Sequence, residues 1–231
     1  MTGALGALRR RETTLIRALD RARRAWLLGR LRALALWKRS TLDLDVAADL
    51  RVGRRITVKV APSTHVKVRI APRCRIGDDV FLFLVNGSLV WGEGVQLRMR
   101  STINLVGDLS CEGDNIFSYG NIIHCAESIR FAPLTQCAEY VTVADSAHFF
   151  TEPDVCVSEN TVTSPIDIGK NVFLAPRVSV GRGVTIGDFC LVGPNSVVVQ
   201  DVASGSFVSG VPAKVVRALD LPWQRVDAPS T

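Results

Sequence analysis

Three histidines, His65, His124 and His148, are the side chains of this chain best suited to accept a proton near neutral pH. His148 stands where a regular pattern over 140–144 runs into a polar segment with two prolines, and Asp145 precedes it in the motif DSAH. A base at this point could deprotonate a hydroxyl or an amine. The alternative is a surface-loop histidine beside two phenylalanines. His124, in the apolar run NIIHC, better fits a hydrogen-bonded structural histidine, and His65 lies remote from this segment.

Asn121, in the motif SYGN, is a second residue with two interpretations. A side-chain amide can donate a hydrogen bond to an oxyanion that develops during a reaction. An asparagine directly after a glycine also commonly caps a turn. The residues alone leave these two interpretations open.

A six-residue repeat sets the elements that must position these side chains. Read in steps of six, large aliphatic residues recur without a break: Ile168, Leu174, Val180, Ile186, Val192 and Val198. The residue directly after each aliphatic is Gly or Ala in the first five cases. The residue four positions after each aliphatic is small or β-branched. Neither the 3.6-residue period of a helix nor a two-residue alternation produces this spacing. We interpret it as short flat strands, three to a coil, whose aliphatic side chains stack in a narrow core.

The same spacing occurs earlier in shifted registers, and each shift implies an inserted residue or loop. One set comprises Val52, Val58, Ile70, Ile76 and Leu82, and another comprises Cys125, Phe131, Cys137 and Val143. The clearest interruption, residues 149–165, predicts an excursion from the solenoid. We therefore predict an all-β parallel β-helix over 41–218, an N-terminal amphipathic α-helix within 1–40 and a flexible tail over 219–231.

Residues 164–217, which end in GVPAKVVR, resemble the C-terminal coils of hexapeptide-repeat acetyltransferases, and residues 117–150 resemble the middle coils. Galactoside and maltose acetyltransferases and bacterial polysaccharide O-acetyltransferases are examples of this family. The resemblance covers roughly residues 50–218 and implies a left-handed β-helix and a homotrimer. It implies transfer of an acetyl or other acyl group from coenzyme A to a hydroxyl of a sugar, glycan precursor or small metabolite. In that setting His148 is the general base, and Asn121 holds the acceptor or the oxyanion.

The resemblance also implies a site for acetyl-CoA as co-substrate. Lys214 and Arg217 match basic positions near the nucleotide end of coenzyme A, and phosphates favour such partners. Turn amides around Ala175, Gly193 and Pro194 are expected to line the pantetheine groove. The alternative for the two basic residues is a solvated tail.

Composition excludes several other classes. Residues 1–40 contain eleven basic and two acidic residues, so the net charge of +6 is an N-terminal property and gives no reason to expect nucleic acid as a partner. The six cysteines form no CxxC pair, which favours buried thiols over disulfides or zinc. The histidines lie 59 and 24 residues apart, so we expect no metal site of the three-histidine kind.

The N-terminal segment predicts a basic amphipathic helix over about residues 4–38. We expect its apolar face to pack on the β-helix or on its copies in the trimer; the alternative is peripheral contact with an anionic membrane through Trp26 and Trp37. No secretory signal and no run of 18 apolar residues is visible, so we expect a cytoplasmic protein, with the inner face of the membrane as its candidate surface.

Three functions remain open on these grounds: O-acylation, N-acylation of an amino sugar, and a non-catalytic β-helix scaffold. Phe173 stands where the family often has Trp, and Val199 and Gln200 stand where it often has Thr-Lys. These departures slightly favour the scaffold or a different acyl chain. The matching position of His148 favours an enzyme.

Overall fold

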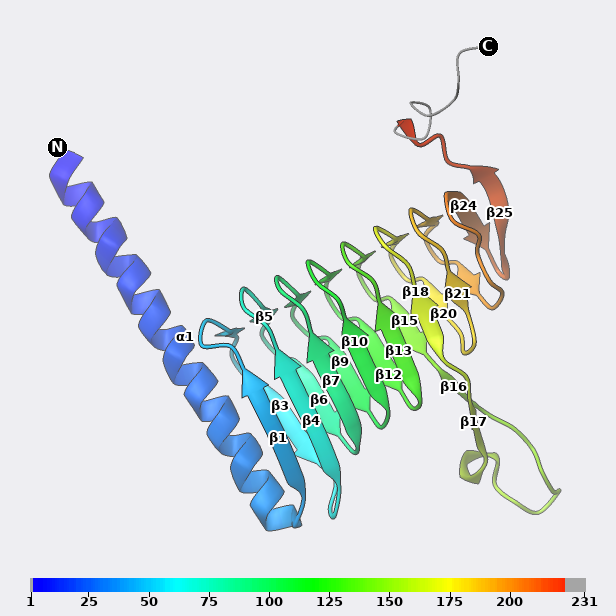
Figure 1. Ribbon diagram of the computed structural model, residues 1–231, viewed down its shortest axis with the longest axis horizontal. Coiled ribbons are helices and arrows are strands. Elements are labelled where there is room, and N and C mark those ends of the chain that lie inside the picture. The colour runs from blue at the N-terminus through cyan, green and yellow to red at the C-terminus, as the bar shows by residue number, and fades with distance from the viewer. Residues whose placement is uncertain (1, 223–231) are drawn as a thin grey trace.

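A computed structural model describes the backbone of residues 2–222 and the side chains of residues 18–222. Helix α1 (Thr2–Lys38) comes first, and three long β-sheets follow, which we name A, B and C. Each coil contributes one strand to each sheet in turn, so that strands far apart in sequence lie side by side along the solenoid (Figure 1). The chain folds as a left-handed parallel β-helix with an N-terminal helix, which confirms the predicted fold class.

The strands are short, as a six-residue repeat requires. Sheet A comprises β1 (Thr41–Val46), β4 (His65–Ile70), β7 (Gly87–Trp91), β10 (Asp108–Cys111), β13 (Ser128–Phe131), β18 (Ile166–Ile168) and β21 (Thr185–Ile186). Sheet B comprises β2 (Arg51–Val52), β5 (Arg75–Ile76), β8 (Gln96–Leu97), β11 (Ile116–Phe117), β14 (Gln136–Cys137), β19 (Phe173–Leu174), β22 (Leu191–Val192), β24 (Ser206–Gly210) and β25 (Ala213–Ala218). Sheet C comprises β3 (Thr57–Val60), β6 (Phe81–Leu84), β9 (Thr102–Leu105), β12 (Ile122–Cys125), β15 (Thr142–Ala144), β20 (Ser179–Val180) and β23 (Val197–Val198). Neighbouring strands in these sheets run parallel, except that β25 runs antiparallel to β24.

The predicted repeat positions form the core. All six aliphatics from Ile168 to Val198 are at most 2% exposed, and the earlier sets are buried with them. In the middle coils the aromatic rings of Phe117 and Phe131 meet edge to face, with centroids 4.9 Å apart. Five of the six cysteines are buried and all six are free thiols, as predicted.

Tight corners explain the small residue that follows each aliphatic. A Cβ built on Gly77 would lie 2.6 Å from the backbone nitrogen of Met99 in the next coil, whereas one on Gly181 would meet nothing closer than 3.6 Å. At the corner between sheets B and C, the residue two positions after this small residue has a backbone conformation in the left-handed region in successive coils. The residues with positive φ there are Arg55, Asp79, Arg100, Gly120, Tyr140, Arg177 and Asn195.

Helix α1 closes the N-terminal end of the solenoid. Leu27, Leu31 and Ala35 on its inner face are buried, and the helix contacts β1, β2 and β3. The inner face thus packs on the β-helix, as we expected. Within the described residues no helix is long and apolar enough to cross a membrane. Of the predicted tail, residues 223–231 lie outside the described part of the chain.

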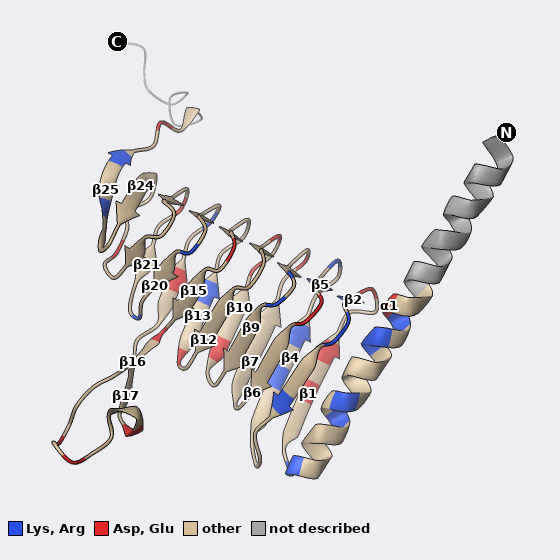
Figure 2. Ribbon diagram, turned by 180° about the vertical axis from the view of Figure 1, so that it is seen from behind, with Lys and Arg blue, Asp and Glu red and all other residues tan. Residues whose placement is uncertain are grey.

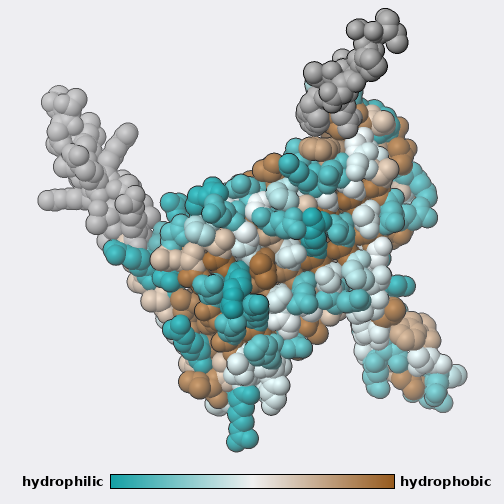
Figure 3. Space-filling view, in the orientation of Figure 1, coloured by the Kyte–Doolittle hydropathy of each residue, from teal (hydrophilic) through white to brown (hydrophobic). Residues whose placement is uncertain are grey.

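The predicted excursion is an antiparallel ribbon that leaves the corner between sheets C and A. Strand β16 (Ser146–His148) pairs with β17 (Thr161–Thr163), and the one-turn helix η1 (Val157–Glu159) lies between them. We call this ribbon, residues 146–163, the arm, and it stands away from the body of the solenoid (Figure 1). On the surface of the solenoid, hydrophilic and hydrophobic side chains form bands (Figure 3).

Candidate active site

His148 ends strand β16 at the base of the arm, and its side chain is exposed. Its Nδ1 lies 3.1 Å from the backbone oxygen of Asn160 and 3.4 Å from the hydroxyl of Thr161, across the ribbon. A carbonyl oxygen can only accept, so in this hydrogen bond Nδ1 carries the proton. The neutral imidazole then has its lone pair on Nε2, which forms no hydrogen bond with a described residue. The ribbon therefore favours the tautomer in which Nδ1 carries the proton and Nε2 has the lone pair.

Asp145 fastens the arm to the solenoid. Its fully buried carboxylate accepts hydrogen bonds from the backbone amides of Ala126, Glu127 and Ser128 at 2.6, 2.8 and 2.8 Å. Its own backbone oxygen accepts a hydrogen bond of 2.9 Å from the amide of Ser164, on the returning strand. Asp145 thus ties both strands of the ribbon to the turn between β12 and β13. The motif DSAH contained this residue, but only the fold gives its role.

Asn121 lies inside the corner before β12 and is 1% exposed. Its Nδ2 donates to the backbone oxygen of Ser118 at 2.9 Å, and its Oδ1 accepts from the amide of Val141 at 2.9 Å. These contacts join two successive coils, so this geometry fits the turn-capping interpretation. The structure does not bring Asn121 and His148 together within one chain.

The other two histidines lie elsewhere. His124 points outward from sheet C, where its Nδ1 lies 3.2 Å from Nδ2 of Asn104 in the preceding coil. His65 is exposed at the start of β4, in the early coils of sheet A. His124 is therefore a hydrogen-bonded residue of a regular strand, as its sequence context indicated.

The residues predicted to bind coenzyme A come together on the C-terminal part of sheet B. The strand register places one apolar row in line, formed by Phe173, Leu191 and Phe207, and the row ends at Arg217. The guanidinium of Arg217 lies 5.9 Å from the ring centroid of Phe207. The result is a strip of apolar side chains with a cation at its end.

A second row of small residues runs beside the first. Ala175, Gly193 and Ser209 are neighbours in successive coils, and Lys214 pairs with Ser209 on β25. The amides of Ala175 and Gly193 donate to the carbonyls of Val192 and Val208, so they already serve the inter-coil ladder. Ala175 and Gly193 are buried, and neither offers a ligand a free amide donor. Pro194 is exposed at the adjoining turn.

Lys214 contacts Gln200, one of the residues that depart from the family pattern. Its Nζ donates a hydrogen bond of 3.2 Å to the side-chain oxygen of Gln200. Gln200, which stands where the family often has a lysine, therefore accepts a hydrogen bond from Lys214. We call the two rows together, with Lys214 and Arg217, the donor strip.

A cleft of about 250 Å³ adjoins the donor strip at Phe173, and Ala138 of the preceding coil also lines it. Arg98 and Glu139 also line it, and the hydroxyl of Ser118 donates a 2.8 Å hydrogen bond to Glu139. This hydrogen bond lowers the pKa of the Glu139 carboxyl below its ordinary value. The cleft thus offers an apolar wall, a carboxylate and a guanidinium.

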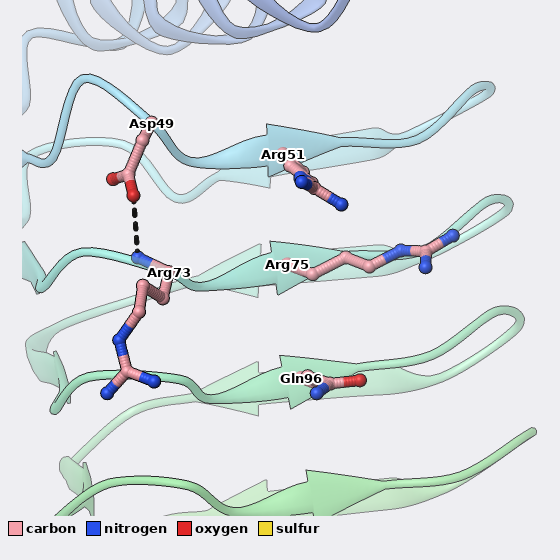
Figure 4. Close-up of a pocket in the computed structure, with 5 residues that line it drawn as sticks. All are labelled: Asp49, Arg51, Arg73, Arg75 and Gln96. Atoms are coloured by element: carbon pink, nitrogen blue, oxygen red, sulfur yellow. Dashed lines mark hydrogen bonds between the residues drawn. The ribbon is translucent and has the colours of Figure 1, made fainter. Parts of the chain in front are cut away.

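A larger cleft, of about 430 Å³, lies on sheet B near α1 and is lined by arginines (Figure 4). Arg51 and Arg75 project side by side from β2 and β5, while the carboxylate of Asp49 accepts a hydrogen bond from the amide of Arg73. This cleft contains none of the residues that sequence reasoning singled out.

The arm and the donor strip occupy different corners of one chain. His148 leaves from the corner between sheets C and A, whereas Ala175 and Gly193 lie at the corner between sheets B and C. The width of sheet C separates them. One chain therefore presents an exposed histidine at one corner and an apolar, cation-ended strip at another.

In sequence, the chain is similar to several proteins named as transferases. Residues 165–200 match the family model described as bacterial transferase hexapeptide (six repeats). A probable acetyltransferase of Mycobacterium tuberculosis is 25% identical over 206 residues, which are 89% of this chain and 62% of that protein. The galactoside O-acetyltransferase of Escherichia coli is 31% identical over 117 residues, which are 45% of this chain and 58% of that protein. The chain thus spans less than two thirds of the length of these relatives.

A solved structure shares the fold. The crystal structure of a mutant N-acyltransferase from Bacillus cereus, in complex with dTDP and coenzyme A, aligns with a TM-score of 0.53 at 14% identity. The alignment covers 76% of this chain and 87% of that one. The chain is thus similar in sequence to hexapeptide-repeat acetyltransferases, and its fold is a left-handed β-helix.

Proposed function

We propose that this protein is a coenzyme A-dependent acyltransferase that uses His148 as its general base and acts on a hydroxyl of a sugar, a glycan precursor or a small metabolite. The observation that carries the proposal is the hydrogen bond from Nδ1 of His148 to the backbone of Asn160, which leaves Nε2 free to accept a proton. The names of the relatives that it resembles support the acyl-transfer class.

The reaction needs no metal. Nε2 of His148 takes the proton of the acceptor hydroxyl as the hydroxyl oxygen attacks the thioester carbonyl. The tetrahedral intermediate then expels the coenzyme A sulfur, which receives that proton from the imidazolium. In this scheme the donor strip binds coenzyme A, with its apolar row against the pantetheine arm and Lys214 and Arg217 at the phosphates.

We further propose that the active form is a homotrimer with each site shared by two chains. His148 and the donor strip lie at different corners of one chain, so a neighbouring copy must bring the second corner to the arm. Closed symmetry would repeat this contact at every interface. Light scattering on the purified protein measures the assembly directly, and a monomer would contradict this proposal.

The test of the base is thiol release from acetyl-CoA against a panel of sugars and amino sugars. We expect His148→Ala to lower kcat by at least about 100-fold, the usual scale for loss of a general base. His65→Ala is the matched control, because His65 is also exposed but lies in the early coils, and it should leave kcat unchanged. Turnover that survives in His148→Ala would refute the assignment and direct attention to His124.

A mixing experiment tests the shared site. Chains with His148→Ala are co-expressed with chains that carry Lys214→Ala and Arg217→Ala, so that mixed trimers form. With random assembly, about one interface in four combines an intact base with an intact donor strip, so about a quarter of the activity should return at low acetyl-CoA. No recovery in verified mixed trimers would show that each chain builds its own site.

A further inference from the structure

Helix α1 has a second apolar face, which points away from the solenoid. At 100° per residue its members lie roughly opposite the buried Leu27, Leu31 and Ala35. We call this face the outer strip, and it consists of Leu19, Ala22, Trp26, Gly29, Ala33, Leu36 and Trp37. Trp26, Leu36 and Trp37 are 50%, 81% and 74% exposed. These three large side chains are thus half exposed or more, although helix positions turned to water are normally polar.

Basic residues border the outer strip on both sides. Arg21 and Arg32 fall on one flank of the helix, and Arg23 and Arg30 fall on the other. The guanidinium of Arg30 lies 5.3 Å from the ring centroid of Trp26, and the ammonium of Lys38 lies 4.2 Å from that of Trp37. An apolar stripe with tryptophans, edged by cations, has the character of an interfacial helix.

Charge divides along the solenoid axis. Residues 18–100 contain 17 basic and 7 acidic residues, whereas residues 101–222 contain 6 basic and 13 acidic ones. Lys and Arg therefore gather on α1 and the first coils, while the arm carries only acidic charges (Figure 2). Arg51 and Arg75, which line the cleft near α1 (Figure 4), form no ion pair with a described residue. The α1 end of the molecule is strongly positive, whereas the acidic excess lies in the middle coils and the arm, where residues 101–163 contain 1 basic and 9 acidic residues.

We propose that the outer strip docks this protein on an anionic lipid bilayer. The apolar side chains enter the boundary between headgroups and acyl chains, and the flanking arginines bind lipid phosphates. A second copy of α1 is the less suitable occupant. It would bring a like set of cations against Arg21, Arg23, Arg30 and Arg32, and like charges at close range repel.

Docking in this way orients the solenoid. Because the outer strip faces away from the coils, the solenoid axis stands roughly along the membrane normal (Figure 1). Four strand spacings of about 4.8 Å separate β1 from β13, the strand beside the arm, so the arm lies about 20 Å beyond the first coil. The acidic half then points away from the anionic surface.

Flotation of the full-length protein with vesicles tests the proposal without any measure of turnover. We expect the protein to float with vesicles of phosphatidylcholine and phosphatidylglycerol, to stay behind with phosphatidylcholine alone, and to be released by high salt. Arg30→Gln and Arg32→Gln should each weaken binding about fivefold, the usual contribution of one basic residue near such a surface. Equal binding to both kinds of vesicle would overturn the assigned role of anionic lipid.

Leu36→Ser and Phe150→Ser form a matched pair for the apolar contact, because each removes an apolar side chain that is 81% exposed. Leu36 lies in the outer strip and Phe150 in the arm, so only Leu36→Ser should reduce flotation. Neither change touches the core, and unchanged melting temperatures would verify that both variants fold. The proposal would be overturned if the unaltered protein did not bind anionic vesicles and Leu36→Ser lost self-association. That result would show that the outer strip contacts a second copy of the chain.

Discussion

The buried carboxylate of Asp145 gives a sharp prediction about the arm. Its two oxygens accept three backbone amides, so the substitution Asp145→Asn must place an NH2 group against at least one of those donors. One lost charge-assisted hydrogen bond costs about 1.5–3 kcal/mol, and a buried donor left without an acceptor adds about 1–3 kcal/mol. We therefore expect a loss of about 3–5 kcal/mol in the free energy of unfolding. For a chain of this size that corresponds to a fall of about 10 °C in Tm.

The assay is thermal unfolding followed by circular dichroism, with Asp201→Asn as the matched control. Asp201 is also an aspartate that accepts a backbone amide, from Thr185 at 2.8 Å, but it is exposed and uses one oxygen. An asparagine can keep that single hydrogen bond, so the control should lose less than about 1 kcal/mol.

A second readout separates the arm from the fold. Loosening the attachment of β16 should lower kcat in Asp145→Asn at temperatures where the protein is still folded, because His148 is no longer held in place. If Asp145→Asn melts within about 2 °C of Asp201→Asn, the three amides do not fasten the arm as we argue.

Three further predictions concern the core and the thiols. Cys156 is the one exposed cysteine, and a hydrogen bond with Ser158 lowers the pKa of its thiol. We expect it to be the single thiol per folded chain that reacts quickly with a disulfide reagent. Rapid labelling of the Cys156→Ser variant would contradict this. Burial raises the pKa of Cys125 to about 12, so unfolded chains release thiol protons above about pH 9 that folded chains keep. Stability should therefore be full below pH 9 and fall as the pH rises toward 12, measurable as a falling urea midpoint. Gly77→Ala should lower the free energy of unfolding by about 1–3 kcal/mol, because the added Cβ meets the backbone of the next coil. Gly181→Ala has room for a Cβ and should lower it by less than about 1 kcal/mol. Equal urea midpoints for the two variants would refute the crowding argument.

The sequence by itself determined the solenoid. A side chain such as Ile168 or Leu174 recurs every sixth residue because each short strand points one large residue inward, and that rule is local. The break after His148 was visible for the same reason, since no six-residue register continues through it. The free and mostly buried cysteines also followed from spacing alone, because small apolar residues fill inward positions.

The tertiary structure alone decided how residues from different coils meet. Phe173, Leu191, Phe207 and Arg217 form one row because strand register aligns them, and nothing in their sequence separation predicts that order after the last coil turns back on itself. The direction of Asn121 was also beyond sequence reasoning, because a cap and an oxyanion donor have the same neighbours along the chain.

The two faces of α1 show the same division. Helical periodicity predicted an amphipathic helix, but Leu27 and Trp26 are adjacent apolar residues, and only packing against the first coil shows that one is buried and the other exposed. Burial depends on which surface the fold brings opposite a side chain. Spacing along the chain specifies what a residue can contact, and the three-dimensional arrangement specifies what it does contact.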